Sequence, residues 1–276
     1  MLGRIAIHLS KDAGLARRLD AAIKLAGQSN AELVGVYPAG PSALGYDDPV
    51  IPSSLTKMLR EREAEVQAEV KALFTEKTEK AGVKSQWRAP RGPAEESLAL
   101  HARYCDLLVM SKVGKEAVNE FNASLPEAVI MAAGRPVLMI PAAGDISSIG
   151  KRVLFCWDHR REAARAFADA APFLASCSEL VVLSIDHDPA DLRYNDIQAG
   201  DFAAFCAARG YPKPQETIKK SEGIGVGNVI LNAATDHGSD LIVMGAYGHS
   251  RMRRWIMGGA SEVLLGSMTV PVLLSH

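Results

Sequence analysis

The sequence lacks the segments that would place the protein in a membrane, in an oxidising compartment or around a metal ion. No apolar run approaches the roughly 20 residues that a membrane-spanning helix needs. The opening stretch, MLGRIAIHLSKD, has no long apolar core followed by a cleavage site. The four cysteines are far apart and show no CxxC or cysteine–histidine metal spacing. We therefore expect a cytoplasmic protein with reduced thiols, no bound metal and no membrane partner.

The charge balance shows no excess of either sign. Lysine and arginine together number 31, against 32 aspartates and glutamates, which gives a formal net charge of −1 at pH 7. This balance argues against a nucleic-acid-binding protein that depends on bulk positive charge, although it leaves room for a local basic site. The sequence also has no GxSxG elbow, no HExxH and no Walker A motif. We therefore expect no catalytic residues and no nucleic-acid partner.

What the sequence does contain is an internal repeat. Residues 104–114, YCDLLVMSKVG, match residues 238–248, GSDLIVMGAYG. Residues 127–141, EAVIMAAGRPVLMIP, match residues 262–276, and the start of the chain matches the stretch that begins at Lys151. Three similar stretches in the same order indicate a tandem duplication. We predict one domain over residues 1–142 and a second over residues 151–276, with a linker near residues 142–150.

Each copy alternates short apolar runs with segments of helical spacing, which indicates a parallel sheet covered on both faces. The fold class that we predict is α/β, with two tandem doubly wound domains of Rossmann-like or flavodoxin-like type. Each domain has a five-stranded, mainly parallel sheet, and ligands bind at the carboxyl ends of its strands. The first copy also contains a loop and then a long charged helix, at Pro41–Ser54 and Leu55–Ala81. The second copy is expected to have strands at Arg152–Trp157, Leu180–Ile185, Gln215–Lys219, Leu241–Met244 and Val270–Leu274, and helices at Glu162–Leu174, Ala203–Arg209, Gly227–His237 and Ser261–Gly266.

Residues 244–265, MGAYGHSRMRRWIMGGASEVLL, hold two groups of glycines on either side of a basic run. Gly245 ends the fourth strand of the second copy, and Gly258–Gly259 precedes the next helix. Glycine permits a positive φ or a close approach of the backbone to a ligand, and a helix N-terminus favours an anion. The pattern G-x2-G-x9-G therefore indicates a wrapped anion. A surface loop with helix-capping glycines is the alternative.

The tandem copies and this glycine spacing resemble the universal stress protein family in its two-domain form, over essentially the whole chain. The resemblance implies an ATP site in which Gly245, Gly248 and Gly258 hold the phosphates. In nucleotide-binding members a serine or threonine follows the third glycine of the motif. Gly259 stands at that position here, so the hydroxyl of the family pattern is missing.

The resemblance further implies an aspartate at the end of the first strand, bound to the ribose, and a backbone contact to adenine after the second strand. Asp158 and Ile185 stand at these positions. From the residues alone, Asp158 is equally suited to cap the helix that follows it. His249, within the glycine loop, is a candidate neighbour of the phosphates. The binding residues that we expect in the second copy are Cys156, Asp158, Ile185, Met244, Gly245, Gly248, His249, Gly258, Gly259 and Ala260.

The first copy has different residues at the same positions. Ser10 stands where the second copy has Asp158, and Ser111 stands where it has Gly245. Glu116 replaces one of the arginines of the glycine loop, and a carboxylate there repels a phosphate. We therefore expect the first domain to be degenerate and empty, with nucleotide binding confined to the second.

The resemblance implies an ATP-binding sensor or regulator of the stress response, with or without Mg²⁺ on the nucleotide. An interaction protein that binds no nucleotide and a slow ATPase are the alternatives. Family members pair the last strands of two domains, so Val137–Ile140 is expected to pair with Val272–Leu274 within one chain, as a pseudo-dimer. A homodimer of the whole chain is left open.

The departure at Gly259 gives a first prediction, that the substitution Gly259→Ser strengthens ATP binding. A hydroxyl that donates to a phosphate oxygen contributes roughly 0.5–1.5 kcal/mol net, so we expect a gain in affinity of about 2- to 10-fold. Calorimetric titration of both proteins with ATP measures it. If neither protein binds detectably at millimolar ATP, the interaction-protein alternative is the better one.

Overall fold

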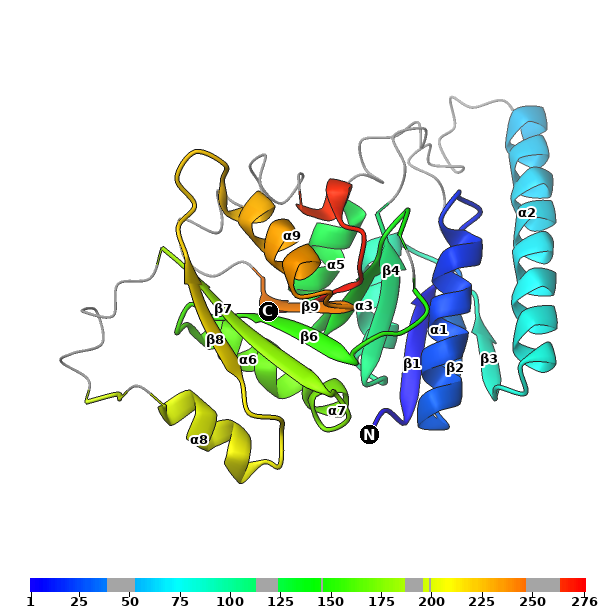
Figure 1. The fold of residues 1–276 in the computed structure, drawn as a ribbon. Helices are drawn as coiled ribbons and strands as arrows, with labels where there is room; N and C mark the ends of the chain where they lie inside the picture. Colours follow the sequence, from blue (N-terminus) through cyan, green and yellow to red (C-terminus); the bar gives the residue numbers. More distant parts are fainter. Residues whose placement is uncertain (39–52, 113–123, 145, 187–195, 199, 247–263) are drawn as a thin grey trace. The chain divides into compact units, whose positions relative to one another are not determined.

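The computed structural model describes residues 1–38, 53–112, 124–144, 146–186, 196–198, 200–246 and 264–276 (Figure 1). The chain divides into two compact units. The first unit comprises Leu2–Arg135, and the second comprises Pro136–His276 together with Met1. Each unit is of α/β type with mainly parallel strands, as the alternating pattern of the sequence predicts.

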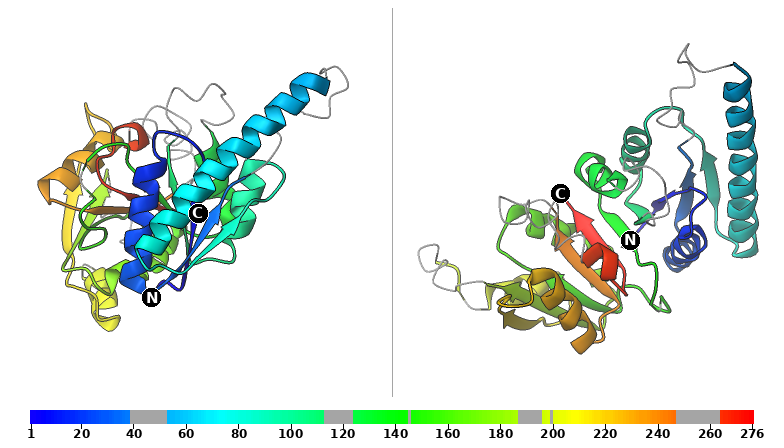
Figure 2. Two further views of the ribbon diagram at one scale, coloured as in Figure 1. Left: turned by 90° about the vertical axis from the view of Figure 1, so that its right-hand side faces the viewer. Right: turned by 90° about the horizontal axis from the view of Figure 1, so that it is seen from above.

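The first unit has four parallel strands in the order β3-β2-β1-β4. Helices α1 and α2 cover one face of this sheet, and α3 and α5 cover the other (Figure 2). Its strands are β1 (Arg4–His8), β2 (Glu32–Val36), β3 (Ser85–Arg88) and β4 (Leu107–Ser111). Its helices are α1 (Leu15–Ser29), α2 (Ser53–Lys80), α3 (Ala94–Ala102) and α5 (Leu125–Ala133).

The second unit has six strands in the order β5-β10-β9-β6-β7-β8. All neighbouring strands are parallel except β5 and β10, which pair antiparallel with Leu273 opposite Leu138. This pairing confirms the expected contact between the last strands of the two copies. The strands are β5 (Val137–Ile140), β6 (Arg152–Cys156), β7 (Glu179–Ile185), β8 (Gln215–Lys219), β9 (Leu241–Gly245) and β10 (Val272–Ser275). The helices are α6 (Arg161–Asp169), α7 (Ala171–Leu174), α8 (Asp201–Ala208) and α9 (Val226–Asp236).

The strand order is the same in both copies. Counted from the first strand of each copy, the strands follow 3-2-1-4 in the first unit and 3-2-1-4-5 in the second. This is the Rossmann order, and it differs from the flavodoxin order 2-1-3-4-5. The α/β fold class with mainly parallel strands is therefore confirmed, and the topology selects the Rossmann-like of its two forms.

One expected helix is interrupted. The periodic stretch Glu162–Leu174 forms two helices, α6 and α7, that are separated at Ala170. Pro172 lies in the first turn of α7 and has no N–H to continue the hydrogen bonds of α6. The long charged helix of the first copy is present as α2. The expected helix Ser261–Gly266 lies partly outside the described residues.

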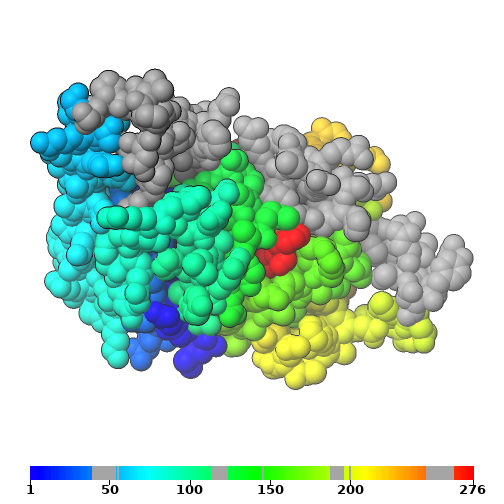
Figure 3. All heavy atoms as spheres, turned by 180° about the vertical axis from the view of Figure 1, so that it is seen from behind, coloured from blue at the N-terminus to red at the C-terminus, as the bar shows by residue number. Residues whose placement is uncertain are grey.

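The outer surface of the first unit carries a few apolar side chains. Figure 3 shows this surface on the side formed by residues 85–112 and 124–135. Leu100, Tyr104 and Met131 are exposed in α3, directly after it and in α5. Scattered apolar side chains of this kind are common on protein surfaces, so we assign no binding site to them.

The structure explains the aspartate that recurs in the repeat. The Asp240 carboxylate accepts hydrogen bonds from the backbone N–H groups of Gly150, Lys151 and Arg152, at 3.0, 3.2 and 2.9 Å. In the first unit, Asp106 accepts from Gly3 and Arg4 in the same way, at 2.7 and 2.9 Å. Each carboxylate therefore fixes the start of the first strand of its copy against the start of the fourth, which is a structural role.

We predict that Asp240→Ala lowers the free energy of unfolding of the second unit by about 1–3 kcal/mol, because hydrogen bonds to a charged acceptor are lost. Urea unfolding measures this loss. Asp236→Ala is the control, because it removes a carboxylate from an exposed ion pair with Lys219 and exposed pairs contribute about 0–1 kcal/mol. Equal effects of the two substitutions would contradict the assigned role of Asp240.

Candidate functional site

The carboxyl ends of the parallel strands of the second unit lie along one edge of its sheet. The register pairs Phe155 with Val243, so the residues that end β6 and β9 are at the same level. Cys156 and Asp158 stand at the end of β6, Ile185 ends β7, and Met244 and Gly245 end β9. Such an edge is where ligands bind in open α/β sheets. The remaining expected residues, Gly248, His249, Gly258, Gly259 and Ala260, lie outside the described residues.

Gly245 lies directly against the first turn of α6. A Cβ atom built at this glycine would come within 2.5 Å of the carbonyl carbon of Glu162 and within 2.6 Å of the backbone nitrogen of Ala163. These neighbours are backbone atoms and cannot move aside as a flexible side chain can. Glycine is therefore required at residue 245 for strand–helix packing, and this packing brings the N-terminus of α6 to the edge of the sheet.

Asp158 lies in the turn between β6 and α6. Its Oδ1 accepts a hydrogen bond from the backbone N–H of Arg160 at 3.1 Å, and its Oδ2 is 3.8 Å from Nε of Arg160. The carboxylate thus orders the turn before the helix. The Asp158 side chain is still 39% exposed, so it can accept further hydrogen bonds from a ligand.

Two titratable groups flank Asp158 and Gly245. Burial, followed by the charge of Asp158, raises the pKa of the Cys156 thiol to about 12, so the thiol stays neutral and is a poor nucleophile. Glu162 was missed in the sequence analysis. Burial raises the pKa of its carboxyl, but the hydrogen bond from Arg161 at 2.5 Å, a backbone hydrogen bond and the charges of Arg161 and His276 together outweigh burial, so the pKa is lowered. Glu162 is therefore ionised and paired at the start of α6.

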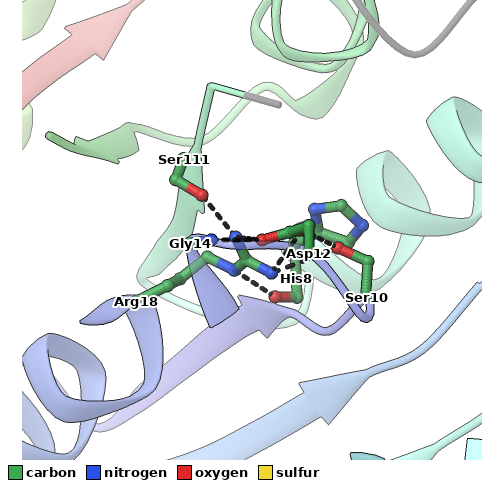
Figure 4. Close-up of polar contacts among 6 residues, drawn as sticks. All are labelled: His8, Ser10, Asp12, Gly14, Arg18 and Ser111. Carbon is green, nitrogen blue, oxygen red and sulfur yellow. Dashed lines mark hydrogen bonds and ion pairs between the residues drawn. The ribbon is translucent and has the colours of Figure 1, made fainter. Parts of the chain in front are cut away.

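The equivalent edge of the first unit holds a buried polar cluster, which Figure 4 shows. We call it the Arg18 cluster: His8, Ser10, Asp12, Arg18 and Ser111. Arg18 is completely buried. Its Nε donates to the carbonyl of His8 at 2.6 Å. Nη1 donates to Ser111 Oγ and to Asp12 Oδ1, the latter at 3.3 Å. Nη2 donates to Ser10 Oγ and Asp12 Oδ2, both at 3.1 Å.

Asp12 balances the charge of Arg18 in this cluster. Its carboxylate also accepts hydrogen bonds from the backbone N–H of Gly14 at 2.8 Å and from the hydroxyl of Ser10. Burial raises the pKa of Asp12, but the charge and hydrogen bonds of Arg18, together with the Ser10 hydrogen bond and the nearby His8, outweigh burial, so the pKa is lowered. The pair is therefore ionised, and the guanidinium has a counter-charge as well as hydrogen-bond acceptors.

The sequence analysis assigned no role to Arg18, although a signal for it was present. Arg18 lies on the buried stripe of α1, between Leu15 and Ala22 in the i, i+3, i+4 spacing of a core-facing helix. An arginine at such a position has to find partners inside the protein. The second copy has Ala166 at this place in the repeat, and it is also buried.

The part of the chain that the structure describes shows neither a membrane-spanning helix nor a metal-binding group of side chains. No helix there combines the length and the apolar character that a membrane span requires. Within the same residues, no three histidine, cysteine, aspartate or glutamate side chains are grouped in a way that could hold a metal ion.

Comparisons with known proteins give a consistent result. The model of the universal stress protein family matches residues 3–141 and again residues 150–276. The structure of a universal stress protein from Archaeoglobus fulgidus is similar at a TM-score of 0.71, with 19% identity over 99% of this chain and 95% of that one. A functionally unknown protein from Pseudomonas aeruginosa is similar at a TM-score of 0.58, with 15% identity over 99% of this chain and 92% of that one. No curated protein matches the chain.

The Arg18 cluster leads to a prediction about acid stability. His8 is buried and its Nδ1 has no hydrogen-bond partner among the described residues. Burial, aided by the Arg18 charge and opposed by Asp12, lowers the pKa of His8 to about 3. His8 therefore binds a proton near pH 6.5 in the unfolded chain, whereas in the folded first unit it stays neutral down to about pH 3. Stability of this unit should fall as the pH drops from 6.5, by about 2 kcal/mol at pH 5.

Urea unfolding at pH 7.5 and pH 5.0 measures this loss. Trp87 on β3 reports the first unit when Trp157 and Trp255 are replaced by phenylalanine. His8→Cys, which copies Cys156 of the second unit, is the control and should remove most of the pH dependence in this range. Asp12 loses its contribution only at lower pH, because its pKa is lowered from 3.8. An unchanged pH dependence in His8→Cys would rule out His8 as the source.

Proposed function

The chain belongs to the universal stress protein family, and from this premise we propose that its second unit binds an adenine nucleotide, with ATP as the expected ligand. The binding residues would be those at the carboxyl edge of β6, β7 and β9, together with the glycine loop that follows β9. The protein would act in the cytoplasm as a sensor or regulator of the stress response. Its role would be nucleotide binding, without efficient turnover.

The observation that carries this proposal is the contact between Gly245 and α6. It brings the N-terminus of a helix, the end of β9 and the Asp158 carboxylate to one edge of the sheet. The helix N-terminus favours a phosphate, and an acceptor carboxylate at a strand end suits the hydroxyls of a ribose. This edge thus offers a helix N-terminus for the phosphates and the Asp158 carboxylate for the ribose of a nucleotide.

The charges near this edge support the same ligand. Arg160 and Arg161 stand at the start of α6, and their side chains are 42% and 85% exposed. Each contacts a carboxylate, Asp158 or Glu162, and remains partly exposed beside a helix N-terminus, where a guanidinium can also contact an anionic ligand. In the first unit the residue equivalent to Arg160 is Asp12, a carboxylate that is already paired with the buried Arg18. The difference favours the second unit as the one that binds.

The two alternatives differ in what they would require. An enzyme would need a general base near the phosphates, and the candidate that the sequence offered, Asp158, has the better role on the ribose. An interaction protein without a nucleotide would use Asp158 and Gly245 only in their structural roles, in the turn before α6 and in the strand–helix contact. Asp158 and the three motif glycines occur together in the same copy, which favours nucleotide binding over both alternatives.

The direct test is to purify the protein, denature it and identify any nucleotide that is released. Calorimetric titration of the nucleotide-free protein with ATP then locates the site. We predict that Asp158→Ala weakens binding by about 10- to 100-fold, because hydrogen bonds to a charged acceptor contribute roughly 1.5–3 kcal/mol.

Ser10→Ala is the matched control, because Ser10 occupies the equivalent position in the first unit. It should leave ATP affinity unchanged. Equal losses from Asp158→Ala and Ser10→Ala would place nucleotide in both units. If the wild-type protein releases no nucleotide and shows no heat of binding at millimolar ATP, the proposal fails.

A further inference from the structure

The Arg18 cluster stands at the counterpart of the candidate nucleotide edge. The strand registers fix this equivalence: Ile7 pairs with Val109 in the first unit, and Phe155 pairs with Val243 in the second. Three residues beyond Ile7 and Phe155 lie Ser10 and Asp158, and two residues beyond Val109 and Val243 lie Ser111 and Gly245. Arg18 correspondingly falls on Ala166. An arginine thus extends toward the strand ends in one unit where the other has only a methyl group.

In both units the end of the fourth strand contacts the start of the first helix. The glycine at this contact belongs to the strand in one unit and to the helix in the other. In the second unit it is on the strand, as Gly245, against Glu162 of α6. In the first unit it is Gly14 at the start of α1, where a Cβ would come within 2.7 Å of Ser111 Oγ. A glycine on the helix side makes room for a side chain on the strand. Ser111 uses this room to accept a hydrogen bond from Arg18.

The cluster uses every donor of the guanidinium. Arg18 has five N–H groups, and the structure shows five acceptor contacts, to the His8 carbonyl, Ser10, Ser111 and both oxygens of Asp12. Its charge is balanced by Asp12 at 3.1 Å. No N–H group of Arg18 remains to bind a phosphate. Random loss of a binding site would leave a buried arginine without partners, whereas this arrangement gives every N–H group of Arg18 an acceptor.

We propose that the Arg18 guanidinium is a built-in ligand of the first unit, which occupies the strand-end site from within the chain. The first unit then excludes nucleotide because its site is already filled, and the chain has a single nucleotide site. The inference rests on the proposed function in one respect: nucleotide is the ligand that the first unit excludes. The site formed by Ser10, Asp12, Ser111 and the His8 carbonyl is itself specific for a planar guanidinium.

The test removes the arginine side chain and supplies a guanidinium from solution. Arg18→Ala leaves Asp12 without its counter-charge, and the thermal midpoint of the first unit should fall by on the order of 10 °C. Methylguanidinium should enter the vacated space and raise the midpoint by on the order of 5 °C at ten times its Kd. Trp87 fluorescence, with Trp157 and Trp255 replaced by phenylalanine, follows this unit. If Arg18→Ala does not fold alone, its refolding yield with and without methylguanidinium gives the same comparison.

Two controls make the rescue specific. Methylammonium has the same charge without the planar set of donors, and it should not rescue Arg18→Ala. Arg17→Ala removes a guanidinium from the adjacent position of α1 and should show no stabilisation by methylguanidinium. The proposal is overturned if methylguanidinium acts no better than methylammonium, if it stabilises Arg17→Ala and Arg18→Ala equally, or if the wild-type chain binds more than one ATP.

The rescue does not involve nucleotide. A failure of ATP binding in the second unit would refute the proposed function and leave the result for Arg18 untouched. A failed rescue would refute the internal ligand and leave the role of Asp158 untouched. The two proposals can therefore fail separately.

Discussion

The contact on which both strand-end sites depend is the one between the fourth strand of each copy and the first turn of its first helix. Each unit has a glycine at this contact: Gly245 on the strand, where a Cβ would meet the backbone of α6, and Gly14 on the helix, where a Cβ would meet the Ser111 side chain. That choice decides what the edge can hold. With the glycine on the helix, Ser111 completes a polar cluster inside the protein. With the glycine on the strand, Glu162 is accommodated and no side chain projects from residue 245.

The fold could be predicted almost completely from the sequence, because its signals are local and repeated. Apolar strands, helical spacing and a twofold repetition are enough to indicate two parallel α/β units, and crossover handedness restricts their topology. The strand order within each sheet could not be obtained in this way, since both Rossmann and flavodoxin orders satisfy the same pattern. The break between α6 and α7 could have been found from Pro172, whose ring removes a backbone donor.

The sites were less predictable, because their properties depend on side chains that are distant in sequence. Asp158 and Gly245 could be placed at one sheet edge from the strand pattern alone. The partners of Arg18 could not, since Ser111 is 93 residues away and reaches Arg18 only through the pairing of β1 with β4. The arginine on the buried stripe of α1 was the available signal. Ser111, which stands where the second copy has Gly245 and was interpreted as a sign of a degenerate site, is a hydrogen-bond partner of Arg18.

Arg18 and Asp12 depend on each other, so the strand-end edge of the first unit could not have changed one residue at a time. In the first unit the strand-end carbonyl of His8 accepts from Arg18 Nε. Replacing the arginine alone would leave the Asp12 carboxylate without its counter-charge, which is costly in a buried setting. Replacing Asp12 alone would leave a buried guanidinium, which costs at least as much. In the second unit Ala166 supplies no donor and Arg160 replaces the aspartate, so that edge has neither the buried guanidinium nor the carboxylate that would balance it, and no side chain of α6 fills it from within.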